Sequence, residues 1–538
     1  MIRRLAICLI PLFLSGTQLA SGDRVNPATT PKRVELKLEA GEFWWGGLSV
    51  DGPKMPYGQT NLFRDLDGND GGNQAQPLLI SNHGRYVWSE RPFAYKFGGG
   101  MLTVTSKYGP IVSGKQGGTL KQVFAFVSKK YFPANGKLPE PLMFTRPQYN
   151  TWIELMYDQN EADVLKYAQA IVDQGYPPGV LMIDDNWQED YGTWEFSARR
   201  FKDPQAMMAR LHQLGFKVML WVVPFVSPDS AVFRDLSKRG LLLRESVGTA
   251  KEPALIRWWN GASAVLDLSN PKSSEWFDGR LRHLSDTYGV DGFKFDAGDA
   301  SFYTGKLTSV KPELANDHTS LWAQIGLKYP LNEFRATWKM AGLPLAQRLR
   351  DKAHAWADLQ ELIPGILAQG LMGYAFTCPD MIGGGEFQSF LDTTTVDQEL
   401  VVRSAQVSAL MPMMQFSVAP WRVLDELHAG VSKRMALLHE ELGPEILRLA
   451  QASALSGEPI VRPLAYAYPD AGYDQIKDEF LLGSDILVAP VLTKNARVRT
   501  IVFPRGTWKG DDGSTVIGPK TEGVQAPLDR LPWYRRVN

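Results

Sequence analysis

The segment Gly289-Val-Asp-Gly-Phe-Lys-Phe-Asp-Ala-Gly-Asp299 decides the fold. It predicts a short buried strand, Gly292–Phe295, which follows an amphipathic helix over Pro271–Tyr288 and carries Asp296 at its C-terminal end. In a parallel barrel the C-terminal strand ends meet at one mouth, where active sites form. Burying an unpaired carboxylate costs on the order of several kcal/mol, so an acid here indicates function more than packing. The alternative is that Asp296 caps the next helix.

Apolar runs alternate with amphipathic stretches from Thr151 onward, which is typical of βα units. The alternation predicts a (β/α)8 TIM barrel over residues 141–456. A doubly wound sheet is the structural alternative, but the sequence offers no Gly-rich nucleotide turn here. The eight expected strands are Thr151–Met156, Gly179–Ile183, Lys217–Val223, Gly292–Phe295, Leu331–Arg335, Ala353–Trp356, Gly373–Thr377 and Met411–Phe416.

Short strand-like runs flank the barrel on both sides. Residues 23–140 are rich in Gly and predict an N-terminal antiparallel β-sandwich, with strands that include 34–38, 101–106 and 122–127. Residues 457–538 predict a small C-terminal β-domain, whose expected strands are 460–466, 480–482, 486–491 and 498–503.

The N-terminus and the charge balance bear on location and partners. Residues 1–22 resemble a secretory signal peptide, with Arg3 and Arg4 before an apolar stretch, so we expect a periplasmic or secreted protein. Acidic and basic residues number 58 each, which disfavours binding to nucleic acid or to an anionic membrane. Cys8 lies within the signal, so Cys378 has no partner for an intrachain disulfide. The sequence leaves the oligomeric state open.

Acidic residues collect at the predicted strand ends. Strand two ends in Ile183-Asp184-Asp185-Asn186-Trp187, strand four in Asp296, and strand seven is followed by Asp380. Carboxylates accept hydrogen bonds from vicinal hydroxyls and Trp rings stack on sugars, so the mouth favours a neutral polyol. Two carboxylates on either side of a glycosidic bond can divide its cleavage between attack and protonation. For a single pair such as Asp184-Asp185, bonding to loop amides is the alternative.

Other catalytic chemistries have no sequence signature in this chain. The seven His form no H-x-H or H-E-x-x-H pattern, so we expect no metal and no cofactor. There is also no G-x-S-x-G elbow and no phosphate-binding loop. Cys378 lies near the predicted mouth without a plausible His partner, and we interpret it as a packing residue.

Three motifs together resemble glycoside hydrolase family 31, which comprises retaining α-glycosidases on a (β/α)8 barrel. They are Gly292-Phe-Lys-Phe-Asp-Ala-Gly-Asp299, Pro379-Asp-Met-Ile-Gly-Gly384 and Met411-Pro-Met-Met-Gln-Phe-Ser-Val-Ala-Pro-Trp421. The resemblance runs from Gln148-Tyr-Asn-Thr-Trp-Ile-Glu154 to Gly483-Ser-Asp-Ile-Leu-Val-Ala-Pro490. It is greatest to the branch that contains the myogenesis-regulating glycosidase, which is associated with α-galactoside cleavage.

The resemblance implies roles for individual residues. Asp296 matches the nucleophile, and Asp351 matches the acid/base by its spacing from Arg335, although Arg348-Leu-Arg-Asp351 replaces the usual W-x-G-D. Asp358, in Trp356-Ala-Asp358, is the alternative acid. We expect the side chains of Arg350 and Lys352 to point away from Asp351, because an inward cation would lower the pKa of a general acid. The implied substrate-binding residues are Asp184, Asp185, Trp187, Trp221, Lys294, Arg335 and Asp380, of which Asp380 could instead be structural.

The strand-eight segment bears on specificity. Family α-glucosidases carry a His there, whereas this chain has Gln415-Phe-Ser417. The sequence therefore predicts a retaining exo-α-glycosidase, favours an α-galactosidase, and implies a glycoside or oligosaccharide substrate. An α-glucosidase, an α-xylosidase, a transglycosylase and a non-catalytic glycan-binding protein are the alternatives.

Overall fold

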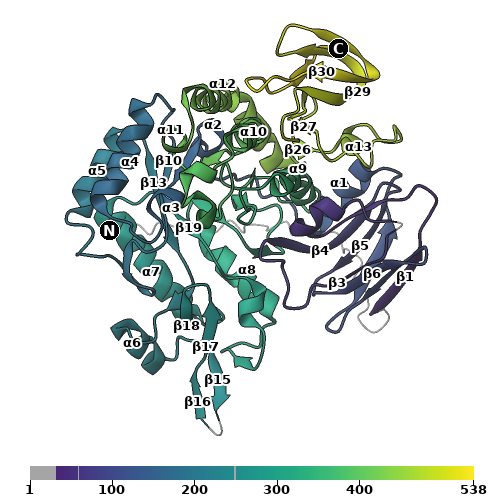
Figure 1. Ribbon diagram of the computed structural model, residues 1–538. Coiled ribbons are helices and arrows are strands. Elements are labelled where there is room, and N and C mark those ends of the chain that lie inside the picture. The colour runs from purple at the N-terminus through teal and green to yellow at the C-terminus, as the bar shows by residue number, and fades with distance from the viewer. Residues whose placement is uncertain (1–31, 59, 248–249) are drawn as a thin grey trace, which may run out of the picture.

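The computed structural model describes residues 32–538 apart from 59 and 248–249 (Figure 1), so the expected signal peptide lies outside the described residues. Its centre is an eight-stranded parallel sheet that is nearly closed into a barrel, which confirms the predicted fold class. In spatial order the strands are β24 (Thr377–Cys378), β23 (Gln347–Arg348), β21 (Leu331–Phe334), β19 (Gly292–Phe295), β13 (Lys217–Val222), β10 (Val180–Ile183), β9 (Gln148–Asn150) and β25 (Gln415–Phe416).

Helices cover the outside of the barrel, and helix α7 (Pro271–Tyr288) shows why they begin and end where they do. The Asn270 side chain caps it by accepting from the Lys272 amide, Pro271 occupies the first turn, and Gly289 ends it in the left-handed conformation. No helix in the described ranges is long and apolar enough to cross a bilayer. The other principal helices are α4 (Glu161–Asp173), α5 (Pro204–Gln213), α6 (Ala231–Arg239), α8 (Ala315–Gly326), α9 (Trp356–Leu371), α10 (Gln398–Ala409) and α12 (Glu426–Ser456).

Three predicted strands of the barrel and the N-terminal domain are wrong in position or type, and the expected strand 373–377 overlaps β24 only at Thr377. The first barrel strand ends at Asn150, and the expected strand 151–156 instead contains the short helix α3 (Trp152–Leu155). The sixth strand is Gln347–Arg348, not 353–356. Its two residues are polar, so no apolar run marks this strand in the sequence. The expected strand 122–127 lies within helix α1 (Leu120–Tyr131), whose buried Leu120, Val123, Phe124 and Val127 follow helical spacing.

The N-terminal domain is built from two antiparallel sheets, as a sandwich requires. Its strand orders are β1-β7-β6-β3 and β2-β4-β5-β8. The bounds are β1 (Arg33–Lys37), β2 (Trp44–Leu48), β3 (Leu62–Asp65), β4 (Gln74–Ser81), β5 (Arg85–Ser89), β6 (Ala94–Gly98), β7 (Met101–Thr105) and β8 (Ile111–Lys115).

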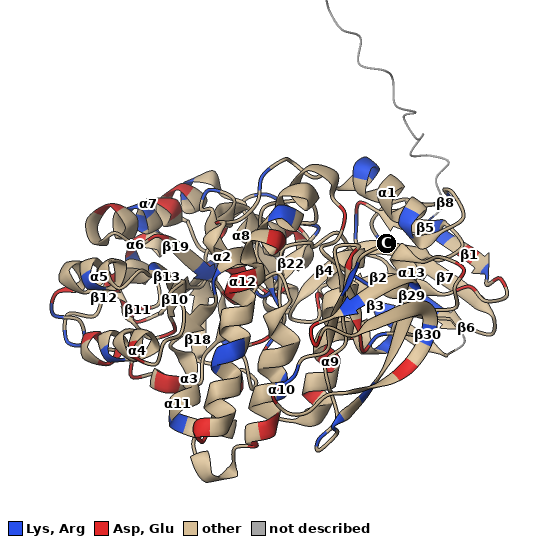
Figure 2. Ribbon diagram, turned by 90° about the horizontal axis from the view of Figure 1, so that it is seen from above, with Lys and Arg blue, Asp and Glu red and all other residues tan. Residues whose placement is uncertain are grey.

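The C-terminal domain is a six-stranded sheet, which confirms the predicted β-domain, but the expected strand 460–466 is wrong because helix α13 (Leu464–Ala467) follows two strand residues. It lies beside the N-terminal domain on the same flank of the barrel, where Phe124 contacts Tyr466 edge to face (Figure 1). Figure 2 shows acidic and basic residues interspersed over the helices, with no large region of one sign in that view. The strands are β26 (Val461–Arg462), β27 (Phe480–Leu482), β28 (Ile486–Val488), β29 (Val498–Gly510), β30 (Thr515–Gln525) and β31 (Trp533–Arg536).

The N-terminal domain is joined to the barrel through backbone contacts. Strand β4 pairs in parallel with β22 (Thr337–Trp338), and the 3-10 helix η1 (Ser49–Lys54) packs on α9. The Asn73 and Gln74 side-chain amides each donate to the carbonyls of Arg335 and Arg348, which directly follow or end barrel strands. The sandwich therefore fixes the backbone of two segments at the barrel mouth.

Gly52 lies at the closest approach between η1 and α9, and its substitution tests this interface. A Cβ at Gly52 would lie 2.3 Å from the Pro364 carbonyl oxygen, so Gly52→Ala must push the two domains apart. We expect it to lower the free energy of unfolding by about 2 kcal/mol, measured by denaturant titration. Gly279→Ala, in α7 with nothing within 4 Å of the new Cβ, should stabilise by up to about 1 kcal/mol. Equal effects of the two substitutions would contradict this account.

Candidate active site

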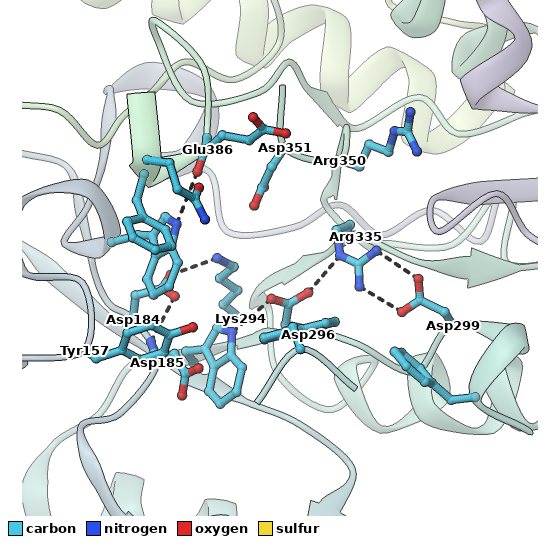
Figure 3. Close-up of a pocket in the computed structure, with 17 residues that line it drawn as sticks. Tyr157, Asp184, Asp185, Lys294, Asp296, Asp299, Arg335, Arg350, Asp351 and Glu386 are labelled. Carbon is cyan, nitrogen blue, oxygen red and sulfur yellow. Dashed lines mark hydrogen bonds and ion pairs between the residues drawn. The ribbon is translucent and has the colours of Figure 1, made fainter. Parts of the chain in front are cut away.

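A cavity of about 640 Å³ opens at the C-terminal ends of the barrel strands. Figure 3 shows acidic and basic side chains projecting into it from several strands and loops. The lining is mixed, with carboxylates and cations at its base and aromatic rings around its rim. The lining residues are Trp152, Tyr157, Asp184, Asp185, Trp221, Trp259, Lys294, Asp296, Asp299, Phe302, Arg335, Arg350, Asp351, Gly385, Glu386, Phe387 and Gln388.

Asp296 follows β19 and is held on both oxygens. Trp221 Nε1 donates to Oδ2 at 3.0 Å, while Arg335 Nε and the Ala297 amide donate to Oδ1 at 3.0 and 2.8 Å. Burial alone would raise the pKa of Asp296, but the charges of Arg335 and Lys294 and the bond from Trp221 hold that pKa well below its ordinary value. Asp296 is therefore an oriented, ionised carboxylate rather than a helix cap.

Arg335 connects Asp296 to the N-terminal domain. Its two terminal nitrogens donate to the two oxygens of Asp299 at 2.9 and 2.8 Å, and Nη1 also donates to the Gly72 carbonyl at 2.7 Å. Buried Asp70 accepts from the Ala300 and Gly72 amides, and burial together with the charge of Asp299 raises its pKa to about 7. The sandwich thus helps to set the position of the cation beside Asp296.

The strand-two acids have different partners. Lys294 Nζ donates to Asp184 Oδ2 at 2.8 Å, and both side chains are almost fully buried. Asp185 accepts from Tyr191 at 3.1 Å and from Asn260 at 2.5 Å. Burial and the neighbouring charge of Asp184 raise the pKa of Asp185 to about 7. Asp184 and Lys294 form the ion pair at the inner end of the cavity, while Asp185 also anchors the turn that carries Asn260.

Asp351 and its alternative Asp358 occupy different places. Asp351 lines the same cavity as Asp296, and its side chain is 42% exposed. Arg348 Nη1 donates to Asp351 Oδ1 at 2.8 Å. Asp358 lines a separate, smaller cavity and accepts from the Ala353 amide at the start of α9. Only Asp351 of the two therefore shares the pocket with Asp296.

The cations near Asp351 differ from expectation in one respect. In Figure 3 the guanidinium of Arg350 points away from Asp351, and Lys352 Nζ lies 3.6 Å from Glu361. These two orientations match the expectation. No sequence pattern indicated that Arg348, three residues before Asp351 and fully buried, contacts the acid directly.

Two of the expected substrate-binding residues lie behind the cavity. Trp187 is fully buried, donates to the Trp221 carbonyl at 2.8 Å and does not line the cavity. Asp380 is equally buried and accepts from Arg348 and from the Lys352 and Gly385 amides. In this structure both support residues that do reach the cavity. Their places in the motifs indicated the right region but not the direction of the side chains.

Sequence reasoning missed the aromatic rim of the cavity. Trp152, Tyr157 and Phe387 meet edge to face, and Trp259 lies 5.5 Å from the Arg335 guanidinium. Trp259 occupies the turn of a hairpin between β17 (Leu255–Trp258) and β18 (Gly261–Val265), and it is 49% exposed. The available sequence signal was a Trp directly before Asn260-Gly261, a pair that favours a turn. Within the described ranges, no cluster of three or more His, Cys, Asp or Glu is arranged to hold a metal ion.

A (β/α)8 barrel with an acid-lined mouth and two β-domains on one flank is the arrangement expected of a glycoside hydrolase. The chain belongs to glycosyl hydrolase family 31. The model of that family's TIM-barrel domain matches residues 141–425, and the model of its C-terminal domain matches residues 457–538.

Individual relatives support the family assignment. The chain is 35% identical to the myogenesis-regulating glycosidase of Mus musculus, over 74% of this chain and 57% of that protein. It is 25% identical to the alpha-xylosidase XylQ of Lactiplantibacillus pentosus, over 96% of this chain and 71% of that one. A Flavobacterium johnsoniae dextranase has the same fold, with a TM-score of 0.82 at 19% identity over 94% of this chain and 66% of that chain. The chain spans about half the length of several curated relatives that it matches.

The raised pKa of Asp185 predicts a pH-dependent stability. Between the ordinary carboxyl value of 3.8 and about pH 7, the folded protein keeps a proton that the unfolded chain has lost. The free energy of unfolding therefore falls as pH rises through this window. We expect Asp185→Asn to show a smaller loss of Tm than the wild type between pH 5 and pH 7, measured by thermal melts. The exposed Asp286→Asn should keep the wild-type slope, and an unchanged slope in Asp185→Asn would contradict the assignment.

Proposed function

We propose that the protein is a retaining exo-α-glycosidase that uses Asp296 as nucleophile and Asp351 as acid/base. The observation that supports this most is the contrast between two carboxylates of one cavity. Asp296 is largely buried and held ionised by Arg335 and Lys294, whereas Asp351 is partly exposed and accepts from Arg348 on Oδ1. Such a division between an attacking carboxylate and a proton donor is what glycoside cleavage requires.

In the first step, an oxygen of Asp296 bonds to the anomeric carbon while the bond from that carbon to the leaving oxygen breaks. Asp351 gives its proton to the leaving oxygen and becomes a carboxylate. Trp221 and Arg335 keep Asp296 in place and hold its charge until attack. The product of this step is a glycosyl ester on Asp296 and a free aglycone.

In the second step, Asp351 takes a proton from water as the water oxygen bonds to the anomeric carbon. The ester bond to Asp296 breaks, and both carboxyl groups return to their starting states. Two displacements at one carbon restore the original configuration, so the sugar leaves as the α-anomer.

The inner end of the cavity supports a terminal sugar as the substrate. Asp184 and Lys294 are both buried there, and together they offer an acceptor and a donor to neighbouring hydroxyls. We propose a terminal α-galactoside, whose axial hydroxyl at position four would meet this pair. The absence of His from Gln415-Phe-Ser417 supports a sugar other than glucose. An α-xyloside is the second candidate, because XylQ aligns with 96% of this chain.

Removal of the nucleophile tests the mechanism. Asp296→Ala should lower kcat for an aryl α-glycoside by at least about a thousandfold, because no group remains to form the ester. Arg335 keeps its bonds to Asp299 in this variant, so circular dichroism and Tm should stay close to wild type. Asp358→Ala, outside the cavity, should keep activity within a few fold. Undiminished turnover by Asp296→Ala would refute the role of Asp296, whereas an absence of turnover by the wild-type protein would favour a glycan-binding protein.

A panel of 4-nitrophenyl α-glycosides tests the sugar and the stereochemistry together. We expect the highest kcat/KM for the α-galactoside among the galactoside, glucoside and xyloside, because the Asp184–Lys294 pair would meet the axial hydroxyl. The first sugar seen by proton NMR should be the α-anomer. A higher kcat/KM for the xyloside would replace galactose by xylose. A β-anomer formed first would exclude the double displacement.

A further inference from the structure

Arg348 occupies an unusual place for a buried cation, directly behind the proposed acid. It ends strand β23, and its side chain is 1% exposed. Nη1 donates to Asp351 Oδ1 and to Asp380 Oδ1, both at 2.8 Å, and Nε donates to Glu333 Oε1 at 3.2 Å. One guanidinium therefore connects carboxylates that come from the ends of three neighbouring strands.

A lone cation in this position would work against catalysis. A general acid must carry a proton at the start of the reaction, and a positive charge in contact with it favours the ionised form. If Asp351 were the sole partner of Arg348, the contact would favour its carboxylate over the protonated acid. Arg348 can serve an acid only if other carboxylates offset its charge.

Glu333 and Asp380 are placed to do this. Both are at most 1% exposed, and neither lines the cavity. Glu333 also accepts from Gln415 Nε2 at 2.6 Å, and Asp380 accepts from the Lys352 and Gly385 amides. Burial and the charge of Asp351 raise the pKa of Asp380 to about 7. Above about pH 7, Asp380 is therefore ionised and can offset the charge of Arg348.

We propose that Arg348 is a positioning residue that holds Asp351 through Oδ1, with Glu333 and Asp380 offsetting its charge so that Oδ2 can carry the catalytic proton. Within the described part of the chain, no hydrogen-bond donor reaches Oδ2 of Asp351. This inference rests on the acid/base role proposed above for Asp351. It adds that two carboxylates outside the cavity offset the charge of the cation that holds Asp351.

Several charged groups besides this cluster act on Asp351 through space. Lys294 and Asp296 lie on or just after β19, and Glu386 lies on the loop across from Asp351 in Figure 3. Arg350 and Lys352 flank Asp351 in sequence but point elsewhere. The test must therefore change the charge beside Arg348 at a residue that makes no contact with Asp351 itself.

Glu333→Gln is the sharpest such change. In the described residues, Gln415 Oε1 and Gln148 Nε2 are buried without a partner, so rotation of the Gln415 amide would give the introduced side-chain amide an acceptor. The variant removes one negative charge beside Arg348 and keeps the volume. We expect the alkaline limb of kcat/KM against pH to move down by about one unit, because Arg348 then bears more fully on Asp351.

Two substrates with different leaving groups distinguish a loss of acid catalysis from a general loss of activity. At pH 8, Glu333→Gln should lower kcat/KM roughly tenfold for a methyl glycoside and hardly at all for the 2,4-dinitrophenyl glycoside, which departs without a proton. Asp278→Asn is the matched control, since Asp278 is a largely buried, ion-paired carboxylate outside the cavity. The alkaline limb of kcat/KM in this variant should coincide with that of the wild type. An alkaline limb of Glu333→Gln that coincides with wild type would overturn the inference.

Asp351→Asn and Asp380→Asn complete the experiment. Asp351→Asn should itself lose far more activity on the methyl glycoside than on the dinitrophenyl glycoside. Equal losses would show that Asp351 is not the acid, which is a failure of the proposed function rather than of the role of Arg348. Asp380→Asn should move the alkaline limb in the same direction as Glu333→Gln. A folded Asp380→Asn with an unmoved limb would count against the inference even if Glu333→Gln failed to fold.

Discussion

The contact of Arg335 with Asp296 and Asp299 is the interaction on which the rest of the site depends. It places a fully paired guanidinium beside a largely buried carboxylate, and the pairing is what makes that burial tolerable. Since the same guanidinium reaches the Gly72 carbonyl, the position of Asp296 is defined by the sandwich as well as by its own strand. The short strand β19 supplies the carboxylate, and barrel residues, chiefly Arg335 and Lys294, hold it ionised.

The two carboxylates proposed to react have contrasting surroundings. Asp296 has donors on both oxygens and cations close by, so its negative charge is stabilised before any substrate arrives. Among the residues that the structure describes, Asp351 accepts a hydrogen bond from Arg348 on Oδ1 alone, and its side chain is partly exposed. Differences of this kind let two chemically identical side chains take opposite roles at one pH. The barrel produces the difference by drawing partners for each acid from different strands.

Sequence patterns located the elements with clearly marked ends but misassigned helix α1 and missed the two-residue strand β23. Helix 271–288 and strand 292–295 were predicted with their observed bounds, because caps and apolar runs mark them clearly. Strand β23 is only Gln347-Arg348. Arg348 belongs to the buried charge cluster, and Gln347 accepts from Thr337. The site followed the same division. Motif spacing located Asp296, Asp351 and Asp184, whereas the orientations of Trp187 and Arg348 depend on packing between strands that no local pattern encodes.

The side-chain amides of Asn73 and Gln74, which bond to the backbone beside Arg335 and Arg348, have a consequence for how the chain can be divided. The matched barrel domain begins at residue 141, yet the backbone that carries two of its mouth cations is held from outside that boundary. An excised barrel would keep every acid that lines the cavity. It would lose the hydrogen bonds from Asn73 and Gln74 that hold the backbone of Arg335 and Arg348. The sandwich is thus a structural part of the catalytic unit, and a graft of this barrel onto a foreign partner would have to reproduce those amide contacts.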